Sequence, residues 1–220
     1  MINQDSDGLF EGDGEERREL SWTETEWEQY LADHEETVRD YLRHYDQLAS
    51  ATDRIDEVAR RMGWEMEMPE EEAPEIDSED ADPEGFESEW EPYTLHRNPV
   101  YVATKAIYVS LTANWERIAA QPGRIAPAVG ITFQSSLYRG REAALQAIQA
   151  LDLGDYALAV CFFKRALREI NDSLARLGSD DVKDRTLLGR YRDYALPRLF
   201  DLREIWLRVM AECRQAQGED

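Results

Sequence analysis

The feature that most constrains the fold of this chain is a long repeat between residues 21 and 62, in which all but two members are apolar. The members alternate at spacings of four and three residues: Trp27, Leu31, His34, Val38, Tyr41, Tyr45, Leu48, Thr52, Ile55, Ala59 and Met62. A repeat of this period is typical of an amphipathic helix that packs against other helices. Ser21 and Glu24 match a capping box, and Gly63 is placed to end the helix. The sequence therefore predicts one long amphipathic helix over residues 21–62.

The C-terminal part of the chain carries further helical patterns. Asn98 followed by Pro99 matches a helix cap and the residue favoured at the first helical position. Apolar spacing predicts four helices, over about 98–120, 127–151, 155–177 and 180–215. Pro197 lies inside the last of them and predicts a kink or a split there. Since no run alternates with period two between hairpin turns, no sheet is expected.

Charge is concentrated outside these helical patterns. The chain has 47 acidic and 25 basic residues, which gives a net charge of −22. Residues 1–20 hold seven acids and two bases, and residues 63–97 hold fourteen acids and one base. These 55 residues therefore carry −18 of the total. Acidity confined in this way is typical of appendages to a folded domain rather than of its surface.

Together these patterns predict an all-α fold: a helical bundle of about five helices with two long outer helices, plus an acidic irregular arm. Residues 1–20 form an acidic N-terminal tail, and residues 63–97 form an acidic, Pro-punctuated arm or linker. The helical core of residues 98–220 forms one domain together with residues 21–62. Large apolar residues are interspersed in the arm, so both a free linker and an arm docked on the bundle remain open.

Composition also excludes several classes of protein. No stretch of about 18 apolar residues exists, and the acidic N-terminus lacks the layout of a signal peptide, so we expect a cytoplasmic protein without a membrane span. Nothing resembles a large basic face, so direct nucleic-acid binding is not expected. Cys161 and Cys213 fall in helical apolar patterns, which predicts two buried free thiols.

The histidines give little support to metal or acid–base chemistry. None of the three has a Glu three residues before it, so the Glu-x-x-His motif of di-metal bundles is missing. The sequence also contains no Cys-x-x-Cys, no His-Glu-x-x-His and no Gly-rich phosphate loop. We therefore expect no cofactor, no metal and no catalytic residue. His34 lies on the apolar repeat and is predicted to be a buried polar position.

Two polar clusters supply the candidate site residues, one where the arm meets the core and one inside the helix predicted over residues 127–151. Their members are Tyr93, His96 and Arg97 in the first cluster, and Tyr138, Arg139 and Arg141 in the second. In one interpretation the arginines are counter-charges on which the acidic arm docks, which also accounts for the apolar residues of the arm. In the other, the two clusters line a pocket for an anion or another small ligand.

Residues 142–172 resemble a single helical hairpin of the tetratricopeptide repeat. The resemblance rests on small, aromatic and helix-contact positions, which are occupied by Gly154, Tyr156, Ala159, Phe163 and Ala166. No second copy of the pattern occurs in the chain, so the resemblance implies a similar hairpin rather than a solenoid. It also implies that the chain takes part in protein–protein interaction.

These observations favour a non-enzymatic protein-interaction module with an acidic arm. The predicted partner of the bundle is either another protein, for which a basic protein is one option, or the protein's own acidic arm, and a homodimer through the long helices is also compatible with the repeat. The alternative is a small-ligand-binding or catalytic helical bundle that uses the His, Arg and Tyr residues of the two polar clusters.

Overall fold

The structure, a computed structural model, describes residues 22–64, 95–123, 125–178 and 185–218. Within these ranges every regular element is a helix, which confirms the predicted all-α helical bundle. The helices are α1 (Glu24–Gln47), α2 (Arg54–Arg61), the 3-10 helix η1 (Leu95–Arg97), α3 (Pro99–Ala119), α4 (Pro127–Asp152), α5 (Tyr156–Leu177) and α6 (Arg185–Ala216).

The chain divides into two compact units. One comprises Met1–Glu35 and Met68–Tyr93, of which the structure describes residues 22–35. The other comprises Glu36–Glu67 and Thr94–Asp220, and we call it the bundle unit. It contains the C-terminal part of α1 and all of the other helices, and the following paragraphs describe this unit by itself unless they say otherwise.

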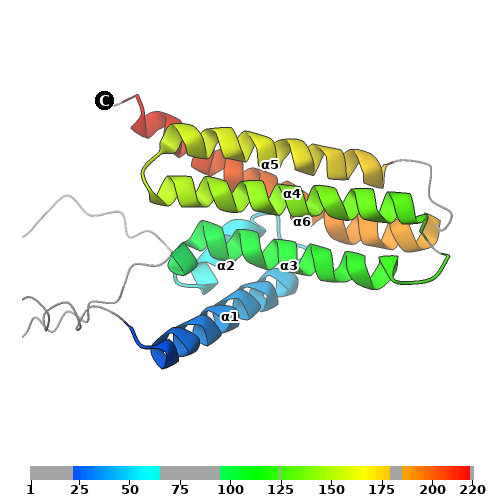
Figure 1. The fold of residues 1–220 in the computed structure, drawn as a ribbon, viewed down its shortest axis with the longest axis horizontal. Helices are drawn as coiled ribbons and strands as arrows, with labels where there is room; N and C mark the ends of the chain where they lie inside the picture. Colours follow the sequence, from blue (N-terminus) through cyan, green and yellow to red (C-terminus); the bar gives the residue numbers. More distant parts are fainter. Residues whose placement is uncertain (1–21, 65–94, 124, 179–184, 219–220) are drawn as a thin grey trace, which may run out of the picture. The chain divides into compact units, whose positions relative to one another are not determined.

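Four helices of the bundle unit pack in a closed order. Helix α4 contacts α3 and α5, and α6 contacts α5 and α3, so each of the four has two neighbours in the ring (Figure 1). The links between consecutive helices are short, which places sequence neighbours antiparallel to one another. The tightest link joins α4 to α5, where Gly154 adopts a φ of 77° that most residues with a side chain avoid.

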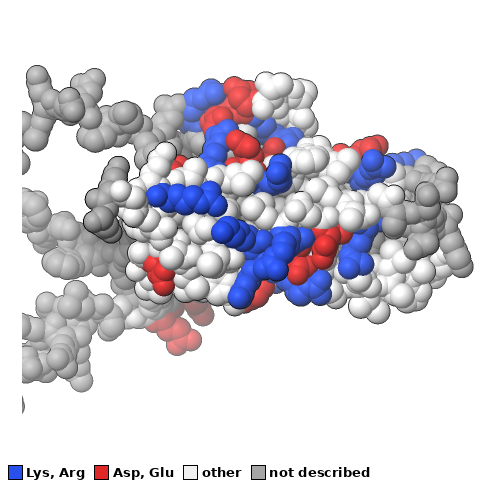
Figure 2. Space-filling view, turned by 90° about the horizontal axis from the view of Figure 1, so that it is seen from above, with Lys and Arg blue, Asp and Glu red and all other residues white. Residues whose placement is uncertain are grey.

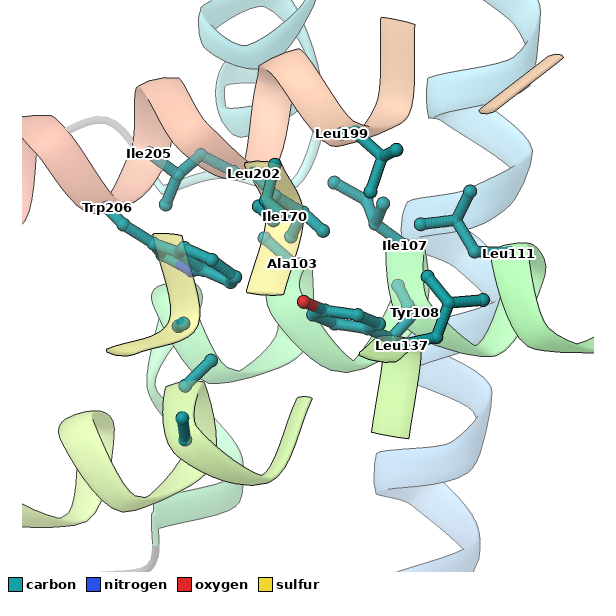
Figure 3. Close-up of a cluster of buried hydrophobic side chains, with 14 of the residues drawn as sticks. Ala103, Ile107, Tyr108, Leu111, Leu137, Ile170, Leu199, Leu202, Ile205 and Trp206 are labelled. Carbon is teal, nitrogen blue, oxygen red and sulfur yellow. The ribbon is translucent and has the colours of Figure 1, made fainter. Parts of the chain in front are cut away.

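The core between these helices is apolar, with aromatic residues from every side. Figure 3 shows Tyr108 of α3 beside Leu137 of α4, and Trp206 of α6 near Ile170 of α5. The Trp206 indole N–H donates to the Thr104 hydroxyl at 3.1 Å, so this large buried ring keeps a hydrogen-bond partner. The core therefore buries a large apolar area, and the indole N–H of Trp206 still forms a hydrogen bond inside it.

Helices α3, α4 and α5 approach closely at Gly140. A Cβ atom at this position would lie 2.6 Å from the Tyr108 hydroxyl oxygen and 3.3 Å from Cβ of Glu169. Side chains do not tolerate a contact of 2.6 Å, so the glycine makes room for Tyr108. A second contact ties α4 to α5 close by, because the buried hydroxyls of Ser136 and Ser173 are hydrogen-bonded at 2.7 Å.

The prediction of one continuous helix over residues 21–62 is wrong at residues 48–53. Helix α1 ends at Gln47 and α2 begins at Arg54. Ser50, Thr52 and Asp53 lie in the intervening turn, and their short polar side chains compete with helical backbone hydrogen bonds. The turn brings Arg54 onto α6, where its guanidinium binds Asp201. A long-range ion pair therefore replaces the continuation of the helix.

Two further local predictions also need correction. The capping box lies two residues later than predicted, because the Glu26 carboxylate accepts hydrogen bonds from the backbone N–H and the hydroxyl of Thr23 at 2.6 and 2.7 Å. These bonds lower the pKa of Glu26. Of the two outcomes predicted at Pro197, a kink or a split, the split is wrong, since α6 continues through it. At both other predicted caps the agreement is good: Asn98 caps α3, and Gly63 follows α2 with a φ of 70°.

Candidate functional site

The first predicted cluster lies at the start of the core. Tyr93 is outside the described residues, whereas His96 and Arg97 form part of η1. The His96 ring packs edge-on against Tyr101 of α3, with ring centroids 5.3 Å apart. Partial burial lowers the pKa of His96, and the positive charge of Lys105 lowers it further. This imidazole is therefore more readily neutral than a histidine in water.

The second predicted cluster separates over two faces of α4. The Tyr138 hydroxyl donates to Glu116 of α3 at 3.3 Å, and the Arg141 guanidinium lies 4.9 Å from the centre of the Tyr138 ring. Arg139 instead faces α5, where its Nε and one Nη each donate to Glu169 at 3.0 Å. The structure thus brings Tyr138 and Arg141 together but directs Arg139 away from them.

Arg139 lines a groove along α4 and α5 with a volume of about 530 Å³. The other lining residues are Ala143, Arg165, Arg168, Glu169, Asn171 and Asp172. Figure 2 shows Lys and Arg side chains gathered in a band on this side of the molecule, with acidic side chains between them. We call this surface the α4–α5 groove.

The charges of the α4–α5 groove do not cancel. Glu169 is bound by Arg139 through two parallel hydrogen bonds, which raise the pKa of Arg139. Arg165 lies over the Phe162 ring at 5.2 Å from its centre, and Arg168 makes no ion pair with any residue that the structure describes. Both arginines are exposed. The groove therefore presents two guanidinium groups that are able to bind a carboxylate from another segment.

A further cluster, which the sequence did not reveal, lies between α1, α2 and α6, and of its charged side chains only Asp46 is mostly exposed. The Asp201 carboxylate accepts hydrogen bonds from the Tyr45 hydroxyl at 2.5 Å and from Arg54 Nε at 2.9 Å. Arg198 donates to Asp46, and its guanidinium stacks 3.6 Å from the centre of the Tyr194 ring. Burial raises the pKa of Tyr45, and the neighbouring Asp201 raises it further.

The chemistry of this buried cluster is structural rather than catalytic. The Asp201 carboxylate accepts hydrogen bonds from donors on α1 and α2, and a tyrosine with a raised pKa stays protonated at neutral pH and is then a poor nucleophile. Arg54 and Arg198 are both less than 10 % exposed, so a substrate has no access to their charges. We therefore assign the cluster to the attachment of α2 to α6.

Among the residues that the structure describes, the remaining His and Cys side chains do not gather into a centre. His34 is 5 % exposed, and Cys213 is buried with a raised pKa, whereas Cys161 is exposed, contrary to the prediction of two buried thiols. In the described part of the chain, no group of three or more His, Cys, Asp and Glu residues is placed to hold a metal ion. No helix described there has the length and apolar character needed to cross a membrane.

The chain was compared with family models, with curated proteins and with solved structures, and it matches none of them.

Proposed function

We propose that this chain is a non-enzymatic, cytoplasmic protein-interaction module that works by competition for its acidic segment. In this proposal, residues 63–97 bind either the α4–α5 groove or a basic partner protein. The observation that carries the proposal is the groove itself, where Arg165 and Arg168 are exposed and Arg168 has no ion pair among the described residues. Guanidinium groups bind carboxylates through paired hydrogen bonds, so an acidic segment is the expected occupant.

The charge of the chain supports this pairing. Residues 63–97 hold fourteen acids and one base, and they belong to the same molecule as the groove. A covalently attached segment has a high effective concentration at its own binding surface, so even weak single contacts suffice to occupy it. A basic partner must then displace the groove to reach the acidic segment. The apparent affinity of the partner for the segment therefore decreases as the groove binds the segment more tightly.

The composition of the groove favours a polypeptide over nucleic acid. Glu169 and Asp172 lie among its arginines, so the groove is not the continuous basic face that follows a phosphate backbone, whereas Arg165 and Arg168 are able to bind single carboxylates. The groove also lies on the α4–α5 hairpin, which contains the residues that resemble a tetratricopeptide hairpin. Helical hairpins of that kind serve protein–protein recognition, which supports the same class of partner.

The proposal is tested by measuring how tightly an octa-lysine peptide binds the full chain. We expect the double variant Arg165→Gln/Arg168→Gln to bind this peptide several-fold more tightly than the wild type, because the groove no longer competes for the acidic segment. The matched control is Arg192→Gln/Arg203→Gln, which removes two exposed arginines from α6 and changes the net charge equally.

Fluorescence anisotropy with a labelled peptide gives the affinities. The difference between the two double variants is expected to shrink as salt is raised, because screening weakens contacts between exposed charges. Equal affinity of the two double variants at low salt would show that the groove does not hold the acidic segment.

A further inference from the structure

A second pocket lies between the C-terminal half of α3 and the N-terminal half of α6. Its volume is about 380 Å³, which is within the range of pockets that hold small organic ligands. Asn114 and Arg117 come from α3, and Arg190, Tyr191 and Tyr194 come from α6. None of the residues that line this pocket lines the α4–α5 groove, so the two sites are independent.

The pocket has two positive charges and no acidic lining residue. Arg117 donates to the side-chain carbonyl of Asn114 at 2.8 Å, and this neutral contact fixes its guanidinium without cancelling its charge. Neither Arg117 nor Arg190 makes an ion pair with any residue in the described ranges. The α4–α5 groove differs in this respect, because there Glu169 forms an ion pair with Arg139.

The walls of the pocket are aromatic and aliphatic. The Tyr191 and Tyr194 rings lie 6.4 Å apart between centres, and Ile118 and Leu187 also line the site. The Tyr191 hydroxyl donates to the backbone carbonyl of Leu111 at 3.1 Å, so it is directed into the protein rather than to a ligand. Burial raises the pKa of Tyr191, and the hydroxyl therefore stays neutral.

We propose that this pocket binds a small organic anion, in which a carboxylate or phosphate is attached to a flat apolar group. Arg117 and Arg190 bind the charged end, since guanidinium groups match the geometry of both anions. Tyr191 is 2 % exposed, so the ring of Tyr194 packs against the apolar end together with Ile118 and Leu187, and the amide side chain of Asn114 adds a polar contact. The charged and the apolar residues that line the pocket thus match the two ends of such a ligand.

The test uses four small probes on the full, isotope-labelled chain. Benzoate and phenyl phosphate carry both features, benzyl alcohol lacks the charge, and inorganic phosphate lacks the ring. We expect benzoate or phenyl phosphate to bind at least tenfold more tightly than either control probe. The affinities are measured from the shifts of the backbone amide resonances of residues 114, 117, 190 and 191. The better of the two then identifies the anion as a carboxylate or a phosphate ester.

Variants assign the binding to the pocket. Arg117→Gln and Arg190→Gln are each expected to lower the affinity for the better probe about tenfold, because each removes one charge-assisted hydrogen bond to the anion. Both side chains are exposed, so the substitutions leave the fold intact, and an unfolding curve of each variant checks this. Arg165→Gln/Arg168→Gln is the matched control and is expected to leave the affinity unchanged.

Two results would overturn the proposal: millimolar benzoate and phenyl phosphate both fail to shift those resonances, or the two pocket variants bind the probe as well as the wild type does. Because the control variant is the one that tests the α4–α5 groove, failure here and failure of the proposed function are separate outcomes.

Discussion

At the scale of single residues, Gly140 shows how a small side chain determines the spacing of helices. The position where its Cβ would lie is 2.6 Å from the Tyr108 hydroxyl oxygen, and Tyr108 is 1 % exposed in the middle of the core. Any larger residue there forces either the tyrosine or helix α4 to move. The site is therefore sensitive to the addition of a single methyl group.

We expect Gly140→Ala to lower the free energy of unfolding by about 2 kcal/mol, because overpacking outweighs the gain in helix propensity. The control is Gly189→Ala on α6, where a Cβ meets nothing within 4 Å. That substitution is expected to raise the free energy of unfolding by up to about 1 kcal/mol, because alanine favours the helix. Urea unfolding of both variants checks the opposite signs, and a stabilised Gly140→Ala protein would contradict the packing argument.

His96 gives a prediction for pH dependence. Its pKa is lowered in the folded protein, by burial first and by Lys105 second, from the ordinary value of 6.5. The unfolded chain therefore binds this proton more readily, so the stabilising contribution is complete above pH 6.5 and is lost as pH falls through the folded pKa. A nuclear magnetic resonance titration is expected to place the His96 midpoint below 6.5, and Lys105→Gln is expected to raise it. A midpoint above 6.5 in the wild type would contradict both causes.

At the scale of elements, the attachment of α2 depends on a few polar contacts. Arg54 binds Asp201 of α6 from the far side of a turn, and the two residues lie 147 positions apart in the chain. Close by, Arg208 of α6 binds Asp56 of α2, but both of these side chains are about half exposed. The same two helices are thus joined by one buried ion pair and one exposed ion pair.

We expect Asp201→Ala to lower the free energy of unfolding by about 3 kcal/mol, because it leaves the buried Arg54 charge and the Tyr45 hydroxyl without their acceptor. Asp56→Ala removes a carboxylate of the same type from the exposed pair, and its expected cost is below about 1 kcal/mol. Urea unfolding at pH 7 measures both. Similar costs for the two variants would mean that burial does not determine the strength of the attachment.

The Arg54–Asp201 ion pair also explains which part of the fold the sequence predicts and which part it does not. The spacing of apolar residues and the pair Asn98–Pro99 identify α3 to α6, because those signals are local. The same spacing continues through residues 48–53, where Leu48, Thr52 and Ile55 keep the repeat although the helix stops. The short polar side chains of Ser50, Thr52 and Asp53 weaken the helix locally, but the apolar spacing does not record the break, which also depends on the distant partner Asp201.

At the scale of the whole molecule, the candidate sites follow the distribution of charge over helix faces. Tyr138 and Arg141 are three residues apart and share a face of α4, whereas Arg139 belongs to the next face. That separation follows from helical geometry and was predictable once the helix was known. Arg165 and Arg168 share a face of α5 by the same rule, and they are opposite the buried stripe of Ala159, Phe163 and Ala166.

The pocket between α3 and α6 was not predictable in this way. Arg117 and Arg190 are 73 positions apart, and only the closed order of the four helices brings them to one site. In the sequence each is one arginine among 22, with nothing to distinguish it from those that bind Glu or Asp. Sites on one helix or hairpin are therefore accessible to sequence reasoning, while a site between helices that are distant in sequence is not.

The buried attachment of α2 has a consequence for temperature. Charged groups lose favourable hydration as water warms, so burying Arg54 and Asp201 costs less in the heat. Apolar contacts, which hold α3 to α6 together, also weaken on cooling. Helix α2 buries only Arg54 and Val58, so its attachment has a smaller reserve of stability than the four-helix core. We expect the cold to loosen α2 from α6 while the four-helix core is still intact.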